Sequence, residues 1–277
     1  MALNYYKNEL KENAQLLASK GKGILAVDES TKTVGKRLAG IGVENTEDNR
    51  KAYRGMLFTT EGLGKYISGA ILFEETLYQN HQDGESMVKK LNDLGIIPGI
   101  KVDKGLNPLP GGGDVETFCS GLDGLVERAA KYYEQGARFA KWRAVLQITN
   151  DGCPSKLSIQ ENAWGLARYA RSVQESGLVP IIEPEILMDG DHTIEKTAEV
   201  QEEVIKQVYI ACQANGVFLE GTLLKPSMTV NGADCPTKAD PMKVAEMTIR
   251  TMERCVPASV PGIVFLSGGL SEEAASV

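Results

Sequence analysis

Short apolar runs of the kind that form buried β-strands recur along the chain and constrain its fold more than any other feature. Seven such runs lie at 23–28, 68–74, 96–103, 137–145, 178–183, 217–225 and 262–267. Segments with a helical spacing of apolar residues separate them, at 49–58, 121–135, 159–176, 197–215 and 241–255. Helix caps are expected at Asn45 or Thr46 and at Ser158. Strand and helix therefore alternate along the chain.

Strands that are apolar along most of their length are typical of parallel sheets with helices on the outside. Seven or eight such units in one chain favour a (β/α)8 barrel, the TIM-barrel architecture, over an open doubly wound sheet. No linker or low-complexity stretch divides the 277 residues. The sequence therefore predicts an α/β protein with a single barrel domain over 1–277.

Charge and composition exclude several classes of partner and site. The formal charge is −7, with acidic and basic residues mixed along the sequence, so the one-sided basic surface that nucleic-acid or membrane binding requires is not indicated. Only two histidines occur, which excludes a three-histidine zinc site. The five cysteines are scattered and never spaced as CxxC, a pattern typical of free thiols in a reducing compartment.

Lys225 ends the apolar run 217–225, where a cation has no structural reason to lie. Charges also lie at the ends of other runs: Asp28, Glu74, Lys101 with Asp103, Lys141 with Arg143, and Glu183 with Glu185. Residues two apart in a strand point to the same side, so each of the last three pairs shares a face. At the carboxyl ends of barrel strands they would converge on the mouth where enzymes of this architecture act. A purely structural network of ion pairs is the alternative interpretation.

These charges favour amine chemistry on a phosphorylated substrate. Lys101, Lys141 and Arg143 would repel the charge of Lys225 and favour its neutral form, which attacks carbonyl groups. The same cations attract phosphate. The turn Ser267-Gly268-Gly269, followed by a helix start, offers backbone N–H groups to an oxyanion. A sugar phosphate fits such a site, because its carbonyl group can react with the lysine and its phosphate can bind the cations and N–H groups.

Three other features are interpreted as structural. The glycine cluster at 110–113 lacks a GxGxxG or P-loop pattern, so we expect a mobile loop without nucleotide binding. His192 has no partner histidine and is expected to be a surface loop residue. Trp142 alternates with its charged neighbours and should pack outward against the helices.

Six motifs in order make the chain resemble the class I fructose-bisphosphate aldolases along essentially its whole length. They are GILAVDES at 23–30, GIKVDKG at 99–105, FAKWR at 139–143, PIIEPE at 180–185, GTLLKP at 221–226 and FLSGG at 265–269. The resemblance implies reversible cleavage of fructose 1,6-bisphosphate to dihydroxyacetone phosphate and glyceraldehyde 3-phosphate, in glycolysis, gluconeogenesis or carbon fixation. It also implies that no metal or other cofactor is needed, because a lysine imine takes that role.

The resemblance assigns roles residue by residue. Lys225 would form a Schiff base with the substrate ketone, and Glu183 would be the acid/base group, with Glu185 as a second candidate. Asp28 and Lys141 would assist the covalent steps and hold substrate hydroxyls, a helix cap being the alternative role for Asp28. The implied phosphate contacts are Ser30, Lys101, Arg143, Ser267 and Gly268.

The family pattern continues into an eighth strand with a phosphate-binding Gly-Arg pair and then a tail, whereas this sequence stops at Val277. We therefore expect a truncated barrel that is open between the seventh strand and the first. The resemblance further implies a homotetramer. The stretch 62–78 is closer to plastid-type members, so the cytoplasm and the plastid stroma are both expected locations.

Two alternatives stand beside the metal-free aldolase. Another Schiff-base aldolase of sugar phosphates, such as a transaldolase-like enzyme, would act on monophosphates and need one phosphate subsite, whereas this sequence offers candidates on both sides of Lys225. An inactive paralogue that acts as a scaffold could lose catalytic residues, yet every expected strand-borne one is present.

Overall fold

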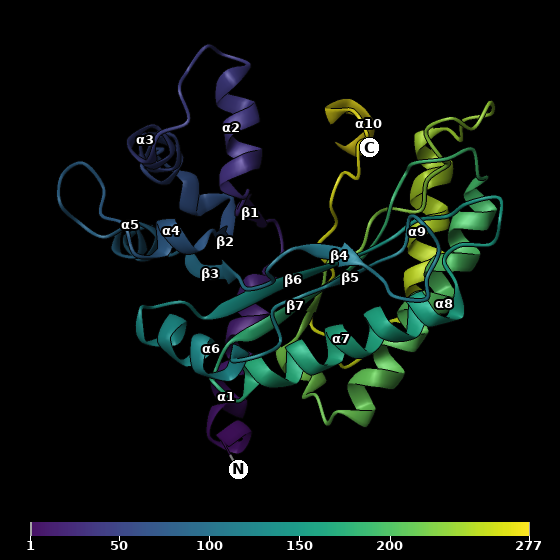
Figure 1. Ribbon diagram of the computed structural model, residues 1–277. Helices are drawn as coiled ribbons and strands as arrows, with labels where there is room; N and C mark the ends of the chain where they lie inside the picture. The colour runs from purple at the N-terminus through teal and green to yellow at the C-terminus, as the bar shows by residue number, and fades with distance from the viewer. Residues whose placement is uncertain (1, 277) are drawn as a thin grey trace.

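The computed structural model describes residues 2–276, and their centre is one curled parallel sheet (Figure 1). Within that range six strands form the sheet, in the order β1 (Gly23–Val27), β2 (Ile67–Leu72), β3 (Ile97–Lys101), β6 (Phe139–Leu146), β7 (Val179–Ile186) and β8 (Leu223–Leu224). Each neighbouring pair is parallel, and the order follows the chain. This arrangement confirms the predicted parallel α/β barrel architecture.

The end of the sheet differs from the prediction. Residues 262–267 do not form the expected seventh strand; they contribute isolated parallel bridges, Leu224 to Ile263 and Ser227 to Leu266. The run 217–225 is likewise mostly outside the sheet, because η2 (Leu219–Gly221) precedes the two-residue strand β8. Pro226 lies between the two bridges and has no N–H to donate, which explains why the ladder is interrupted there.

The sheet is open where the sequence predicts an open barrel. β1 pairs with β2 on one side, and no strand among the described residues pairs with its other edge. A cavity of about 320 Å³ lies in the gap, between β1 and residues 263–265, and Lys225 is part of its lining.

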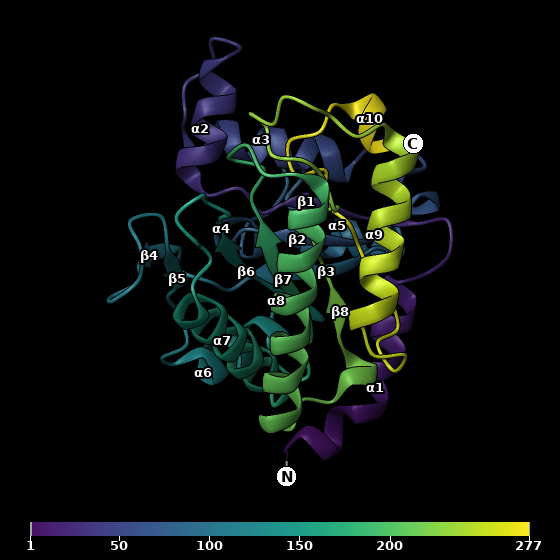
Figure 2. The same cartoon turned by 90° about the vertical axis from the view of Figure 1, so that its right-hand side faces the viewer.

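Helices follow the strands and cover the outside of the sheet (Figures 1 and 2). The longer ones are α2 (Thr31–Ala39), α3 (Glu47–Phe58), α5 (Met87–Asp93), α6 (Leu125–Glu134), α7 (Lys156–Gln174), α8 (Ile194–Ala214) and α9 (Pro241–Cys255). Short elements are η1 (Leu63–Lys65), α4 (Glu74–Leu77) and α10 (Glu272–Ser276). α7 packs against α8, and α8 against α9. Among the described residues no helix has the length and apolar character needed to cross a bilayer.

The five predicted helices are all present, but one predicted cap is wrong. Thr46 caps α3 as expected, because its side chain accepts a hydrogen bond from the N–H of Asn49. Ser155, and not Ser158, caps α7: its hydroxyl accepts from the Ser158 N–H at 3.1 Å. Sequence reasoning did not foresee α1 (Ala2–Leu17), α2 or α5.

α1 covers the end of the barrel where the strands begin, at the bottom of Figure 2. Its buried residues Leu10 and Leu17 belong to a separate core cluster with side chains from the first half of several strands, among them Phe139. A side chain at Gly99 would collide with the Phe139 ring, and one at Gly69 would meet both that ring and Leu17. Glycine at these positions therefore leaves room for the core at this end.

A hairpin that the sequence did not predict follows β3. It consists of the antiparallel strands β4 (Leu106–Pro108) and β5 (Thr117–Cys119), and the glycine cluster 110–113 lies in its connection. The loop expected to be mobile is held by Glu116, whose carboxylate accepts from the N–H of Gly113 at 2.8 Å and from the hydroxyl of Ser155 at 2.8 Å. One buried carboxylate therefore ties this loop to the start of α7.

Candidate active site

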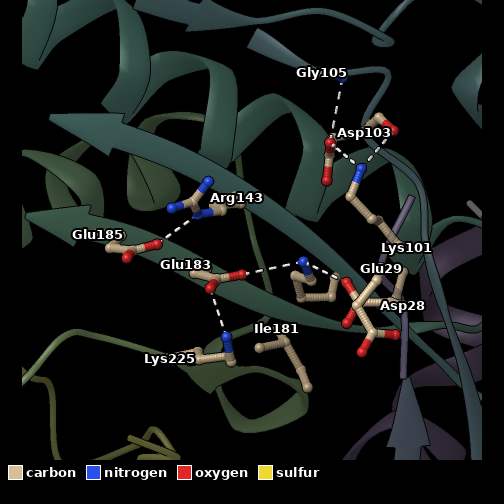
Figure 3. A network of polar contacts seen from close by, with 12 residues as sticks. Asp28, Glu29, Lys101, Asp103, Gly105, Arg143, Ile181, Glu183, Glu185 and Lys225 are labelled. Atoms are coloured by element: carbon tan, nitrogen blue, oxygen red, sulfur yellow. Dashed lines mark hydrogen bonds and ion pairs between the residues drawn. The ribbon is translucent and has the colours of Figure 1, made fainter. Parts of the chain in front are cut away.

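A continuous chain of contacts joins four side chains from four strands (Figure 3). The Nζ of Lys225, after β8, lies 2.5 Å from Oε1 of Glu183 on β7. The other oxygen of Glu183 lies 3.4 Å from Nζ of Lys141 on β6, which lies 2.7 Å from Oδ2 of Asp28, just after β1. The structure thus brings together four of the five residues that the sequence predicted as catalytic; the fifth, Glu185, lies in a separate ion pair with Arg143.

Strand alternation explains why these side chains meet. In β7 the inward positions carry Ile181, Glu183 and Glu185, and in β6 they carry Lys141 and Arg143. The β6 and β7 register pairs Arg143 with Glu183, so the charged halves of both strands lie next to each other. The apolar halves, nearer the strand starts, form the core cluster above α1.

The central pair is buried. Lys141 and Glu183 are 4% and 2% exposed, whereas Lys225 is half-buried and so can meet a ligand. Burial opposes the charge on Lys141, but the carboxylates of Glu183 and Asp28 outweigh it and raise the pKa of the ammonium group. Lys141 is therefore a fixed cation in this site at neutral pH.

Two further ion pairs flank this chain. Lys101, the last residue of β3, lies with its Nζ 2.6 Å from Oδ1 of Asp103, and the guanidinium of Arg143 contacts the carboxylate of Glu185. Burial opposes the charge of Arg143, but the hydrogen bond to Glu185 outweighs it and raises the arginine pKa. Both cations are partly accessible, and each could exchange its partner for an anionic ligand.

The sequence predicts that Lys101, Lys141 and Arg143 repel the charge of Lys225, but the expectation left out the carboxylates beside them. Each cation near it has a carboxylate partner, and Lys225 itself faces Glu183. A buried carboxylate that contacts an amine can instead accept its proton, which leaves a neutral nucleophile. The structure therefore places a candidate proton acceptor, Glu183, next to Lys225.

The remaining predicted phosphate contacts are Ser30, Ser267 and Gly268. Ser30 caps α2, its hydroxyl accepting from the Thr33 N–H at 3.3 Å, so the cap is Ser30 rather than Asp28. Ser267 is exposed, and Gly268 has a φ of 60°, in a turn just beyond the bridge between Ser227 and Leu266. Within residues 2–276 no hydrogen bond or ion pair joins Ser30, Ser267 or Gly268 to the Lys225 cluster.

The sequence also made predictions for Glu74, His192 and Trp142, and only the one for Trp142 is confirmed. Glu74 begins α4 and accepts a hydrogen bond from the hydroxyl of Tyr132 at 2.9 Å, in place of a contact in the cluster. His192 is not a surface residue: it is buried, and neither ring nitrogen has a hydrogen-bond partner among the described residues. Trp142 packs outward as predicted, stacked on Tyr169 of α7 with ring centroids 5.4 Å apart.

Sequence reasoning missed two buried residues that support the site. Arg54 of α3 is fully buried and donates to the carbonyl of Glu29 at 2.7 Å, next to Asp28. Gln201 of α8 is buried and donates to the carbonyl of Ser227 at 2.9 Å, two residues after Lys225. Gln201 is a polar residue among mostly apolar buried residues of α8, and that pattern was an available signal, whereas the buried face of α3 carries Arg50 as well as Arg54 and offered none.

No group of three or more histidine, cysteine, aspartate or glutamate side chains within 2–276 has the arrangement of a metal site. The site contains three lysines and an arginine, each in an ion pair with a carboxylate.

Comparison with known proteins gives the same family by independent routes. A sequence profile described as fructose-bisphosphate aldolase class-I matches residues 9–277. The chloroplastic fructose-bisphosphate aldolase 3 of Arabidopsis thaliana is 58% identical over 272 residues, which cover 98% of this chain and 69% of the relative. Fructose-bisphosphate aldolase 1 of Toxoplasma gondii is 59% identical over 270 residues, covering 97% of this chain and 74% of the relative.

A solved structure agrees. Fructose-bisphosphate aldolase from Plasmodium falciparum, in a complex with TRAP and a small-molecule inhibitor, is similar with a TM-score of 0.96 at 55% identity. The match covers 98% of this chain and 78% of that chain. The profile, the relatives and the fold together show that this chain belongs to the class I fructose-bisphosphate aldolase family.

Proposed function

We propose that Lys225 is the nucleophile of the aldolase reaction and forms a Schiff base with the ketone at C2 of fructose 1,6-bisphosphate. The observation that carries this proposal is the 2.5 Å contact between its Nζ and the buried carboxylate of Glu183. Transfer of the ammonium proton to Glu183 leaves an amine that attacks C2, and the carbonyl π electrons move to oxygen. A proton then moves from the attacking nitrogen to that oxygen, and the product is a carbinolamine.

Glu183 is placed to move the protons of the next step. As a carboxylic acid it gives a proton to the C2 oxygen, the C2–O bond breaks, and water leaves. The nitrogen of Lys225 then forms a double bond to C2 and carries a positive charge. Lys141, whose Nζ lies 3.4 Å from the other oxygen of Glu183, stabilises the carboxylate that results.

The iminium group accepts the electrons of the carbon–carbon bond. Removal of the proton from the C4 hydroxyl breaks the C3–C4 bond and releases glyceraldehyde 3-phosphate, and the electron pair forms an enamine. Protonation of C3 and hydrolysis of the imine release dihydroxyacetone phosphate and regenerate Lys225. Glu183 is our first candidate for the C4 proton and Glu185 the second, with Asp28 and Lys141 holding substrate hydroxyls.

The two phosphates need cations and backbone donors. Arg143 and Lys101 lie on the neighbouring strands β6 and β3. Each forms an ion pair with a carboxylate, and an incoming phosphate can take the place of that carboxylate. The turn at Ser267 and Gly268 and the start of α2 at Ser30 supply hydroxyl and N–H groups. These assignments give a bisphosphate two anion subsites, which a monophosphate enzyme would not need.

Covalent trapping tests the proposal. The purified chain is incubated with dihydroxyacetone phosphate, EDTA and borohydride, which reduces an imine to a stable secondary amine, and the peptides are mapped by mass spectrometry. We expect an adduct on Lys225. The matched control is Lys225→Arg, which keeps a cation for Glu183 but cannot form the imine, and should give neither adduct nor cleavage. An adduct elsewhere, or full activity of the arginine variant, would contradict the assignment.

Two further implications of the resemblance stay predictions: the homotetramer and the location in the cytoplasm or the plastid stroma. The names of several similar relatives include the word chloroplastic, which favours the plastid. The family activity makes sugar phosphates the expected partners, and we favour the aldolase over a scaffold or a monophosphate enzyme because both flanking cations and the full contact chain are present.

A further inference from the structure

A buried polar network lies under the chain segment that follows Lys225. Its centre is Gln201 of α8, which is 2% exposed. The amide nitrogen of Gln201 donates to the carbonyl of Ser227 at 2.9 Å and to its hydroxyl at 3.2 Å. The amide oxygen accepts from the hydroxyl of Thr229 at 2.5 Å, and the Thr229 N–H donates to Thr248 of α9 at 2.9 Å. The segment is thus fixed to two outer helices.

The same network crosses to the strand that carries Glu183. Regular pairing between β7 and β8 covers two residue pairs and ends where the N–H of Lys225 donates to the carbonyl of Ile182 at 2.8 Å. Beyond that point the hydroxyl of Ser227 accepts from the N–H of Ile186 at 3.2 Å. A side chain therefore replaces the backbone ladder just beyond the position where Lys225 and Glu183 face each other.

We propose that Gln201 is a positioning residue that holds Lys225 against Glu183 through Ser227. The inference rests on the proposed function, since it assigns Lys225 the role of nucleophile. With β8 only two residues long, the backbone at Lys225 is fixed on one side by Ile182 and on the other by Ser227. Loss of the Gln201 amide leaves Ser227 free to shift, and a displacement of ~1 Å at a reacting group can reduce the rate by about 10²-fold.

The first variant is Gln201→Met, which keeps the length of the side chain and removes its donor and acceptor. We expect kcat for fructose 1,6-bisphosphate to fall about tenfold, which corresponds to ~1.4 kcal/mol in the barrier. KM should change less than about twofold, because Lys101 and Arg143 are fixed by β3 and β6 and only interactions specific to the transition state are weakened. The rate of borohydride trapping on Lys225 should fall with kcat.

Gln174 provides a matched control, because it fixes the chain segment that precedes β8. It is fully buried in α7, its amide nitrogen donates to the carbonyl of Phe218 at 2.8 Å, and its oxygen accepts from the Phe218 N–H at 3.0 Å. Gln174→Met removes a comparable brace before β8 rather than after it. We expect this variant to lose stability in urea as Gln201→Met does, but to keep the parent kcat at temperatures where both are folded.

Ser227→Ala provides a second test that does not disturb α8, in case Gln201→Met fails to fold. It removes the hydroxyl that links Gln201 to Ile186 and should lower kcat in the same direction. The proposal is wrong if a folded Gln201→Met or Ser227→Ala variant traps substrate as fast as the parent, or if Gln174→Met loses kcat equally. Absence of an adduct on Lys225 in the parent chain would instead refute the proposed nucleophile.

Discussion

His192 is buried in the loop between β7 and α8, and its titration should make the stability of the protein depend on pH. Burial lowers the pKa of its imidazole in the folded state. The unfolded chain, in which a histidine titrates near ~6.5, then binds a proton more readily than the folded one. The contribution of His192 is therefore fully present above pH ~6.5 and is lost as the pH falls through the folded pKa.

The test compares urea unfolding at pH 7.5 and pH 5. His192→Gln removes the titrating group, so this variant should lose less stability between the two pH values than the parent does. His81→Gln is the matched control, because it removes the other histidine, which lies 3.2 Å from Asp83. The control should keep the acid sensitivity that His192 causes. Equal losses in the parent and in His192→Gln would exclude this residue as the source.

At the residue scale, local pattern predicted which side chains share a site but not how they pair. The two-residue period places Lys141 with Arg143 and Glu183 with Glu185 on inward faces, and the structure confirms this. Which cation meets which carboxylate depends on register and on side-chain reach, so the contact of Lys225 with Glu183 was not foreseen. The prediction that His192 lies on the surface was wrong for a related reason. The burial of a loop depends on segments that are distant in sequence, which here lie around Gly232.

At the scale of elements, hydrophobic period identified most of the long helices, with α1 as the exception, and failed on the short or interrupted elements. α7 and α8 span five or more turns and were found, whereas α2 has a glycine at its centre and β4 and β5 have three residues each. Residues 262–267 show a strand-like pattern yet form isolated bridges, since Pro226 interrupts the segment with which they pair.

The tie between the 110–113 loop and α7 leads to a prediction at this scale. Burial of Glu116 favours its neutral form, but hydrogen bonds from Ser155 and Gly113 outweigh it and lower the carboxyl pKa, so the group is ionised at neutral pH. Glu116→Ala removes the acceptor for three donor groups, the N–H of Gly113 and the N–H and hydroxyl of Ser155. We expect a loss of about 1–3 kcal/mol in unfolding free energy, the cost of buried groups left without partners.

Hydrogen exchange followed by mass spectrometry measures where the effect lies. Peptides that cover 110–116 and the start of α7 should exchange faster in Glu116→Ala, and those that cover α1 should not change. Asp114→Asn is the matched control, because Asp114 is exposed on the same loop and its substitution should leave both peptides at the parent rate. Unchanged exchange in Glu116→Ala would show that other contacts hold this loop.

At the scale of the whole molecule, the core cluster that contains α1 and the candidate active site lie at opposite ends of the strands. Leu10 and Leu17 of α1 pack with Phe139 and Ile181 at the end where the strands begin. Glu183 lies two residues further along β7 than Ile181, and the contact chain to Lys225 lies on that side. Barrels of this kind separate a catalytic face from a stabilising one in the same way.

This separation predicts that damage to α1 weakens the fold without changing the chemistry. Leu10→Ala removes a fully buried side chain and should cost about 2–5 kcal/mol of unfolding free energy, because the cavity cannot close completely. Leu16→Ala, on the half-exposed face of the same helix, should change stability by less than about 0.5 kcal/mol.

Urea unfolding and steady-state kinetics of the two variants together test whether damage to α1 weakens the fold without changing the chemistry. Below its unfolding transition, Leu10→Ala should keep the kcat and KM of the parent, in contrast to Gln201→Met, in which kcat falls. A lower kcat in folded Leu10→Ala would mean that the loss of packing against α1 shifts β7 and, with it, Glu183. In that case a change in packing at one end of the strands would alter the geometry at the other end. The position of Lys225 would then depend on the whole core rather than on its contacts through Gln201 and Ser227.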